Sequence, residues 1–289
     1  MTVETVGVVT FYVKGDDHEY GDSGERERAE RTRDVAERVV GRLEELGVDH
    51  VYDERTAAAL DRDGVALDAM EDAVDAVVAV GGDGTILRCV QRMQDPVPVL
   101  GVNTGRLGFL AAASADDVEH RVDDLIDEGP IERRARLAVT VDGDSVLPAL
   151  NETVVVTSRP AKIMEVAVRH DGETVEEVRA DGLVVATPTG STAYAMSAGG
   201  PLLQPSVDGR LVVPLAPFRR STSPWVLDAD GRTTIELTRV DRSASVVQDG
   251  SHVDEVGHGT EIVFERHDND AVFLASDESF FERVQRKLG

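Results

Sequence analysis

The chain of 289 residues is poor in cysteine and contains no long apolar run. Its single cysteine, Cys89, excludes an internal disulfide and a zinc site built from several cysteines, so we expect a small core residue there. No apolar stretch approaches the ~20 residues that a membrane-spanning helix needs, and the first residues lack the pattern of a signal peptide. We therefore expect a cytoplasmic protein with no membrane partner.

Positive charge is also scarce, and lysine is the scarcest form of it. The net charge is −25, and only Lys14, Lys162 and Lys287 among the 30 basic residues are lysines. Such an acidic surface disfavours nucleic acid and anionic membranes as partners. We interpret the acidic runs Asp16–Glu27 and Asp116–Glu128 as hydrated faces, adapted to a high-salt cytosol that screens their mutual repulsion.

The first 130 residues alternate between strand-like apolar runs and helix-like periodic segments. This alternation predicts a doubly wound α/β domain over residues 1–130. The expected strands are Val6–Phe11, Val48–Tyr52, Val74–Val80 and Val97–Val102, and the expected helices are Arg26–Leu46, Ile86–Met93 and Ala113–Ile126. Gly47 stands where a helix C-terminal cap is expected.

After Pro130 the pattern changes to short strands separated by turn residues, which predicts an all-β domain over residues 131–276, in the form of a β-sandwich. Asp142-Gly143-Asp144 and Asp171-Gly172 are hairpin signals. The expected strands are Arg136–Val141, Leu147–Thr157, Met164–His170, Thr174–Arg179, Leu183–Ala186, Leu211–Leu215, Thr233–Leu237, Ala244–Gln248, Glu261–Phe264 and Ala271–Ala275. The last segment, Ser279–Leu288, has helical spacing, and residues 277–289 are expected to return to the first domain.

The segment Ala76–Leu87 is the centre of the chain. A buried strand ends in Gly81-Gly82-Asp83-Gly84-Thr85, which places Asp83 at the carboxyl end of a strand, where open α/β sheets bind ligands. A helix starting near Thr85 would direct free N–H groups at a phosphate. Asp83 could then take a proton from an attacking hydroxyl or meet a metal–phosphate complex, although a helix cap is the simpler alternative.

A second glycine-rich turn, Gly101–Leu110, follows the next strand, and we expect the two turns to line one crevice. In the β domain, the segment Asp181–Pro201 starts as a short apolar strand and continues as a stretch rich in serine, threonine and glycine. A polar ligand could approach the backbone closely there and form hydrogen bonds with the hydroxyl groups. A Ser/Thr-capped helix followed by a loop would explain the same residues. Asn151 and Glu152 begin an apolar strand and could grip a ribose diol, or could simply mark a strand edge.

Taken together, these segments resemble the NAD kinase family. The resemblance is carried by Gly81–Thr85, Gly101–Phe109, Asn151-Glu152 and Asp181–Tyr194 with Gly199-Gly200-Pro201, in matching order and spacing. It implies phosphorylation of the adenosine ribose 2′-hydroxyl of NAD by ATP or polyphosphate, giving NADP. It also implies a Rossmann-like first domain, a β-sandwich second domain and a last helix that returns to the first. With the acidic composition, it suggests a halophilic archaeon as the source.

The resemblance also assigns roles to individual residues. Asp83 is the catalytic base, and Phe109 packs on the adenine. Asn151 and Glu152 bind ribose hydroxyls or the adenine edge, and Asp181 contacts the nicotinamide half or its ribose. The other implied nucleotide-binding residues are Gly84, Arg88, Lys162, Arg179, Thr189, Thr192, Ala193, Tyr194, Ser197 and Ala216.

The resemblance further implies a divalent metal, with Mg²⁺ expected, that arrives with the phosphate donor; no dedicated protein metal site is visible in the sequence. It implies a homo-oligomer, either a dimer or a tetramer. Two other functions compete. A diacylglycerol-type lipid kinase shares the GGDG turn, although the net charge of −25 speaks against a membrane-facing surface, and a non-catalytic NAD-binding regulator should lack a carboxylate at position 83.

Overall fold

The computed structural model describes residues 3–10, 23–105, 108–159, 162–219 and 221–289. Two compact units emerge from the packing of the chain: an N-terminal unit, Met1–Arg133 with Ala271–Gly289, and a C-terminal unit, Arg134–Asp270. Of the acidic run Asp16–Glu27, residues 16–22 lie outside the described residues. Within them, no helix is long and apolar enough to cross a membrane.

The N-terminal unit is built on an eight-stranded sheet of order β3-β2-β1-β4-β5-β20-β7, with β6 beside β5. Its strands are β1 (Thr5–Thr10), β2 (Asp49–Asp53), β3 (Gly64–Val65), β4 (Ala76–Gly81), β5 (Val99–Asn103), β6 (Ala113–Ser114), β7 (Ile131–Arg134) and β20 (Ala271–Leu274). Its helices are α1 (Ser23–Leu46), α2 (Glu54–Leu60), the 3-10 helix η1 (Leu67–Ala69), α3 (Met70–Ala73), α4 (Asp83–Arg92), α5 (Val118–Ile126) and α7 (Phe280–Leu288). The pairs that join β3, β2, β1, β4, β5 and β20 are parallel, which confirms the α/β class of this half.

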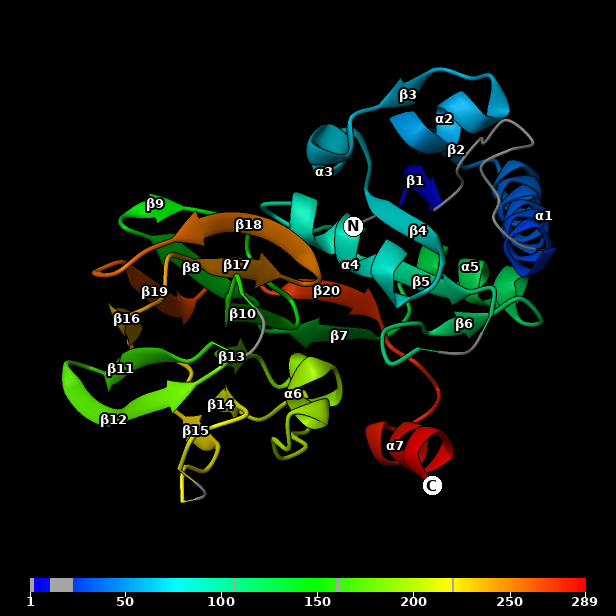
Figure 1. Ribbon diagram of the computed structural model, residues 1–289. Coiled ribbons are helices and arrows are strands. Elements are labelled where there is room, and N and C mark those ends of the chain that lie inside the picture. Colours follow the sequence, from blue (N-terminus) through cyan, green and yellow to red (C-terminus); the bar gives the residue numbers. More distant parts are fainter. Residues whose placement is uncertain (1–2, 11–22, 106–107, 160–161, 220) are drawn as a thin grey trace. The chain divides into compact units, whose positions relative to one another are not determined.

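Helices α1 and α5 lie side by side on one face of this sheet (Figure 1). Val39 and Leu43 of α1 and Val122 of α5 share a buried core with Val8 and Val78 of the strands. All residues of β4 and β5 are buried, as their continuous apolar sequences predict for strands covered on both faces. This core fixes the carboxyl ends of β4 and β5, from which the two glycine-rich turns leave.

Three local expectations for this half need correction. Ala113 and Ser114 form the short strand β6, so the helix expected over Ala113–Ile126 starts only at Val118. The run expected as a β-domain strand, Ala271–Ala275, provides β20, which pairs with β5 through Phe273 and Val99. The short elements α2, β3, η1 and α3 were not expected, because each is too brief to show a clear period.

The C-terminal unit consists of two antiparallel six-stranded sheets, of orders β15-β14-β13-β10-β17-β18 and β12-β11-β16-β19-β8-β9. Its strands are β8 (Leu137–Val141), β9 (Asp144–Ser145), β10 (Glu152–Thr157), β11 (Met164–His170), β12 (Glu173–Ala180), β13 (Gly182–Ala186), β14 (Arg210–Leu215), β15 (Trp225–Leu227), β16 (Thr233–Arg239), β17 (Ala244–Gln248), β18 (Ser251–Val256) and β19 (Glu261–Arg266). Between β13 and β14 lie the 3-10 helix η2 (Thr189–Thr192) and the single turn α6 (Tyr194–Ser197). The expected β-rich second half is therefore confirmed.

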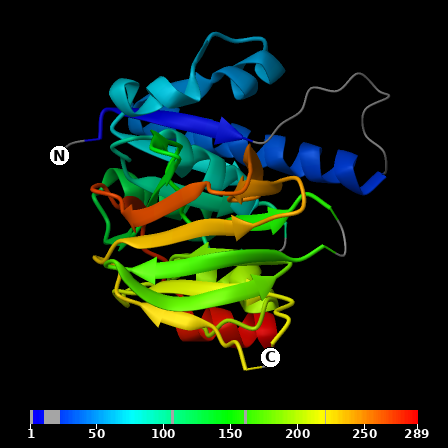
Figure 2. The same ribbon diagram turned by 60° about the vertical axis from the view of Figure 1, so that its left-hand side comes forward.

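One buried core joins the two sheets of this unit. Val155 and Val246 come from the first sheet, and Val166, Ile235 and Phe264 come from the second. Figure 2 shows β11, β12 and β16, in green to yellow-orange, running side by side in the second sheet. The alternation of apolar and polar residues along these strands places one face in the core and the other in solvent.

The hairpin expected between Arg136–Val141 and Leu147–Thr157 is only partly right. The turn at Asp142 and Gly143 does have two residues with positive φ, but the returning strand is β9, just two residues long. The chain then crosses to the other sheet, where β10 pairs with β13 and β17. Alternation alone could not reveal this crossing, because the strands of both sheets alternate in the same way.

Candidate active site

Asp83 is the first residue of α4 and follows the buried strand β4. Gly81 has a φ of 158°, and a Cβ built there would lie 2.4 Å from the Thr85 hydroxyl oxygen, so this position needs glycine. Gly82 is the N-cap and offers no side-chain cap. The helix begins at Asp83, two residues before the expected start near Thr85, so Asp83 is the first helical residue and not the N-cap. The next residue, Gly84, is exposed to solvent.

The second turn holds the Asp83 carboxylate. The Phe109 N–H donates to Oδ2 at 2.8 Å, and the Leu110 N–H donates to Oδ1 at 3.3 Å. Gly108 packs directly against the same carboxylate, since a Cβ built there would lie 1.6 Å from Asp83 Oδ1. Asp83 and Phe109, predicted from separate motifs, are thus brought together as expected, with the carboxylate only half-buried.

Arg88 is also on α4, but its guanidinium is bound within the protein. Nη2 lies 3.4 Å from Asp53 Oδ2 and donates to the Thr10 carbonyl at 3.3 Å. Asp53 is a buried N-cap of α2 that accepts from the Thr56 N–H at 3.2 Å. Burial lowers the pKa of Arg88, and the Asp53 charge opposes this shift. The predicted nucleotide contact of Arg88 would have to use donors left over from these bonds.

In the C-terminal unit, Asp249 organises the Asn151-Glu152 segment. Its carboxylate accepts from the backbone N–H groups of Leu150, Asn151 and Glu152 at 2.8, 2.9 and 3.0 Å. Asp249 itself sits in a left-handed turn with a φ of 46°. Burial raises its pKa, while the three N–H donors oppose the shift. This carboxylate fixes the backbone from which the Asn151 and Glu152 side chains project.

Glu152 is buried, and its Oε2 has no hydrogen-bond partner among the described residues. Burial, and then the charge of Asp249, raises the pKa of Glu152 to about 7, while a backbone hydrogen bond from Tyr194 opposes the shift. A buried acceptor without a partner costs about 1–3 kcal/mol. A ligand hydroxyl that donates to Oε2 would remove this cost.

The segment after β13 folds against Asn151. The Thr187 N–H donates to the Asn151 carbonyl at 2.9 Å, and a Cβ at Gly190 would lie 2.1 Å from that carbonyl oxygen. The hydroxyl-rich stretch is therefore held beside Asn151 and Glu152. Thr189 is buried, whereas Thr192, Ala193, Tyr194 and Ser197 keep accessible surface.

Other predicted residues gather at the opposite end of β13. The Asp181 N–H donates to the carbonyl of Leu215. Ala216, the residue after Leu215, has a φ of 46°. The Arg179 carbonyl accepts from the Phe218 N–H, and its guanidinium lies 4.9 Å from the centre of the Phe218 ring.

The predicted residues of this unit thus form two groups along one strand. Glu152 pairs with Ala186 and Val156 pairs with Gly182, so four residue steps along β10 separate the groups, or about 14 Å. Lys162 is linked to the Asp181 group through Thr157, whose hydroxyl donates to the Lys162 carbonyl at 3.2 Å and whose N–H donates to the Asp181 carbonyl at 3.0 Å. The Lys162 ammonium forms an exposed ion pair of 3.3 Å with Asp241.

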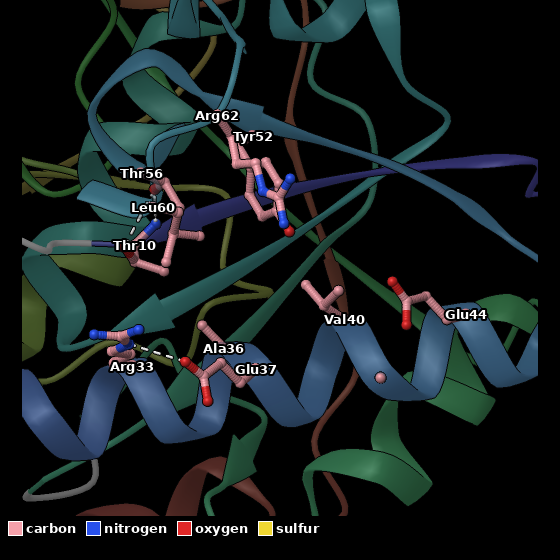
Figure 3. Close-up of a pocket in the computed structure, with 11 residues that line it drawn as sticks. Thr10, Arg33, Ala36, Glu37, Val40, Glu44, Tyr52, Thr56, Leu60 and Arg62 are labelled. Atoms are coloured by element: carbon pink, nitrogen blue, oxygen red, sulfur yellow. Dashed lines mark hydrogen bonds and ion pairs between the residues drawn. The ribbon is translucent and has the colours of Figure 1, made fainter. Parts of the chain in front are cut away.

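A cavity of about 310 Å³ lies in the N-terminal unit, between α1 and the β1, β2 and α2 region (Figure 3). Val40 and Ala36 line one side and Tyr52 and Thr56 the other. None of the predicted site residues lines it, although its lining residue Thr10 accepts a bond from Arg88. In the described parts of the chain, no group of three or more His, Cys, Asp or Glu side chains is arranged to hold a metal ion.

The sequence did not reveal Asp249 and Gly108 as site residues. Asp249 lies nearly 100 residues from the segment it binds, and the pairing of β10 with β17 is what brings them together. Gly108 was part of a quoted motif, but its contact with Asp83 depends on how two turns pack. Arg283 of α7 was also missed; it donates to the Phe109 carbonyl at 2.7 Å.

Comparison with known proteins gives two family matches. Residues 22–130 match the model of the ATP-NAD kinase N-terminal domain, and residues 150–276 match that of the ATP-NAD kinase C-terminal domain. An NAD kinase of Methanoculleus marisnigri is 42% identical over 246 residues, covering 85% of this chain and 90% of the relative. An NAD kinase of Methanocorpusculum labreanum is 39% identical with the same coverage.

Solved structures give the same picture. An NAD kinase from Archaeoglobus fulgidus in complex with ATP is 31% identical, with a TM-score of 0.76, and the match covers 99% of this chain and 97% of that one. A yeast NADH kinase complexed with NADH has a TM-score of 0.85 over 100% of this chain and 88% of that one. At 21% identity, this second likeness concerns the fold alone.

Proposed function

The chain belongs to the NAD kinase family, and from this premise we propose how its residues divide the reaction. It is a phosphotransferase that phosphorylates the adenosine ribose 2′-hydroxyl of NAD to give NADP. The observation that carries the residue assignments is the carboxylate of Asp83, held at the end of β4 by two N–H groups of the second turn.

We assign Asp83 the role of general base. A ribose hydroxyl is a poor nucleophile at neutral pH, and a positioned carboxylate that takes its proton accelerates transfer by ~10²–10⁴-fold. The N–H groups of Phe109 and Leu110 fix the orientation of the carboxylate. Each oxygen keeps a further lone pair for the hydroxyl. Catalysis by the rest of the site is then mainly positioning and charge stabilisation.

We assign Asn151 and Glu152 to the ribose hydroxyls of NAD or to the adenine edge. The partnerless Oε2 of Glu152 supports this role, because a ribose hydroxyl is a donor that fits it. Thr192, Ala193, Tyr194 and Ser197 are accessible beside this segment. Asp181 and Ala216, at the far end of β13, suit the other half of a long dinucleotide, with Arg179 close by.

ATP or polyphosphate is the proposed donor, and Mg²⁺ is expected to arrive with it. When bound, the metal would neutralise phosphate charge. The protein's own residues supply proton acceptance, by Asp83, and hydroxyl recognition, by Glu152. A diacylglycerol-type lipid kinase, considered because of the GGDG turn, is not supported: the relatives described above are NAD or NADH kinases.

The test is an activity panel on the purified protein. NAD and NADH are offered as acceptors, with ATP and polyphosphate as donors, at low and at molar salt, and NADP or NADPH is measured. A diacylglycerol vesicle with ATP serves as the control acceptor. We expect NADP with at least one donor and no lipid phosphorylation; labelled phosphate on the lipid and none on NAD would contradict the proposal.

Several finer features remain proposals. We propose that the N-terminal unit, residues 1–133 with 271–289, is a Rossmann-like domain and that the C-terminal unit, residues 134–270, is a β-sandwich, in place of the bounds 1–130 with 277–289 and 131–276 expected from the sequence. We also propose a cytoplasmic location and adaptation to high salt. We also propose a homo-oligomer; the exposed Phe218, Trp225 and Val226 at and near the edge strand β15 support it, because large apolar side chains gain from being covered. Light scattering across a range of protein concentrations would measure the oligomeric state.

A further inference from the structure

Helix α7 brings two basic side chains to the Phe109 backbone and ring. Arg283 and Lys287 are four residues apart, so they lie on one face of the helix. Arg283 is buried and donates to the Phe109 carbonyl at 2.7 Å, and the Lys287 ammonium lies 4.2 Å from the centre of the Phe109 ring. Because the Phe109 N–H donates to Asp83, this one residue connects α7 to the proposed base.

The start of α7 is firmly fixed. Ser279 and Glu282 form a capping box, with bonds of 3.3 and 2.8 Å, and the Arg286 guanidinium binds the Glu278 carboxylate through two bonds of 2.8 and 2.7 Å. The capping box and the buried Arg283 bond to Phe109 hold the helix in place without using Lys287, and the exposed Arg286 pair adds little to them. The ammonium is therefore carried to Phe109 by a helix that is stabilised independently of it.

Lys287 differs from the arginines around it. Arg88 is bound to Asp53, and Arg283 to a backbone carbonyl. Lys287 is exposed and has a ring contact, but no carboxylate lies within ion-pair distance of it among the described residues. Partial burial lowers its pKa, and the negative charge of Asp83 opposes the shift. An ammonium has three donors and no acceptor, so it can bind an anion here.

Lysine is an unusual residue in this chain. Only three of the 30 basic residues are lysines, so arginine is the usual source of positive charge. The arginine guanidinium is planar and carries a delocalised charge, whereas the lysine ammonium is a compact charge at the end of a flexible side chain. A lysine over the ring of Phe109, the residue whose N–H binds Asp83, departs from this general use of arginine. A small cation that follows a phosphoryl group during transfer would explain the departure.

We propose that Lys287 is a phosphate-binding residue of the active site, which contacts the terminal phosphate of the donor as that phosphate is transferred. The proposal rests on the proposed function. In the step, the bond between the terminal phosphorus and its bridging oxygen breaks, and a bond from phosphorus to the ribose 2′-oxygen forms. The hydroxyl proton goes to Asp83, and the electron pair of the broken bond stays on the shortened donor. Lys287 keeps its proton and contributes only charge.

The kinetic test compares Lys287→Ala and Lys287→Arg with Arg286→Ala. Arg286 is the matched control, because it is the neighbouring exposed cation and binds Glu278 instead. A lost charge-assisted hydrogen bond lowers kcat/KM for the donor by about 10- to 100-fold. We expect that loss in Lys287→Ala, partial recovery in Lys287→Arg, and a value within ~2-fold of the parent in Arg286→Ala. Equal donor kcat/KM in Lys287→Ala and the parent would overturn the proposal.

A second readout does not need turnover. Reductive methylation with ¹³C-formaldehyde labels the three lysines and the N-terminus and keeps their charge, and Lys287→Arg assigns the Lys287 signal. ATP is added to at least ten times its dissociation constant, measured by calorimetry. We expect the Lys287 signal to move and its pKa to rise on binding, because the phosphate stabilises the ammonium. An unmoved signal at saturation would refute the contact.

The two readouts separate this inference from the proposed function. If the parent protein makes NADP but Lys287→Ala keeps its donor kcat/KM and the signal does not move, only the role of Lys287 fails. If the parent makes no NADP while ATP still moves the Lys287 signal, the proposed phosphorylation of NAD is refuted, whereas the contact between Lys287 and the phosphate is supported. Thermal unfolding of each variant checks that α7 still packs.

Discussion

Replacing Gly108 by alanine should disable Asp83 without unfolding the protein. The alanine Cβ would lie 1.6 Å from Asp83 Oδ1, and an ordinary contact begins at 3.4 Å, so the carboxylate must recede by about 1.8 Å. That movement breaks its bonds from the Phe109 and Leu110 N–H groups. A misplacement of ~1 Å at a reacting group can cost ~100-fold in rate. We therefore expect kcat/KM to fall at least ~100-fold, or ~2.7 kcal/mol of transition-state stabilisation.

Gly105→Ala is the matched control on the same turn. The nearest atom to a Cβ there is Asn103 Oδ1 at 3.9 Å, so this variant should keep its activity within ~2-fold. NADP formation is measured at varied NAD and ATP, with thermal unfolding alongside. If Gly108 acts through Asp83, adding Gly108→Ala to Asp83→Asn should cause little further loss. A folded Gly108→Ala with near-parental kcat/KM would refute the reasoning.

Other predictions concern charge in the C-terminal unit and in the whole chain. Asp249→Asn replaces the anionic acceptor of three N–H groups by a neutral amide, so KM for NAD should rise by about 10-fold while kcat changes less; an unchanged KM would contradict the positioning role. If the ionised Glu152 accepts a ribose hydroxyl, KM for NAD should fall as the pH rises through about 7. Removing the Asp249 charge in Asp249→Asn should move the midpoint of that change to lower pH. A KM for NAD that does not change with pH would exclude this role for Glu152. The pKa of Glu152 is higher in the folded than in the unfolded protein, so the stability that its neutral form contributes is present below pH ~4.3 and is lost as the pH rises through about 7. In Glu152→Gln, the unfolding free energy should no longer depend on pH in this window. With a net charge of −25, the unfolding temperature should rise between 0.1 M and molar salt, where the screening length falls from ~10 to ~3 Å; a maximum in dilute buffer would refute the salt adaptation.

Much of the architecture could be predicted from local pattern. The run Ala76–Val80 and the glycines after it indicated a strand that ends at Asp83, and the structure has β4 and α4 there. The hairpin at Asp171 and Gly172 was also correct, because two residues with positive φ specify that turn. These elements depend on neighbours in sequence, which is the information that a single sequence carries.

Elements that depend on distant partners were harder to predict. β20 looks like any short β-domain strand, but it pairs with β5, more than 160 residues earlier. Asp249 and Lys287 were visible as residues, yet their contacts with the Asn151-Glu152 backbone and with Phe109 arise only when remote segments pack. Hydrophobic periodicity reports which face of an element is buried, not what covers it.

The most direct test of the central claim is Asp83→Asn. The amide keeps the size of the side chain but is a far weaker proton acceptor than the carboxylate. NAD binding, measured by calorimetry, should stay within a few-fold of the parent, while NADP formation falls at least ~100-fold. An Asp83→Asn protein that phosphorylates NAD at nearly the parental rate would show that the base lies elsewhere.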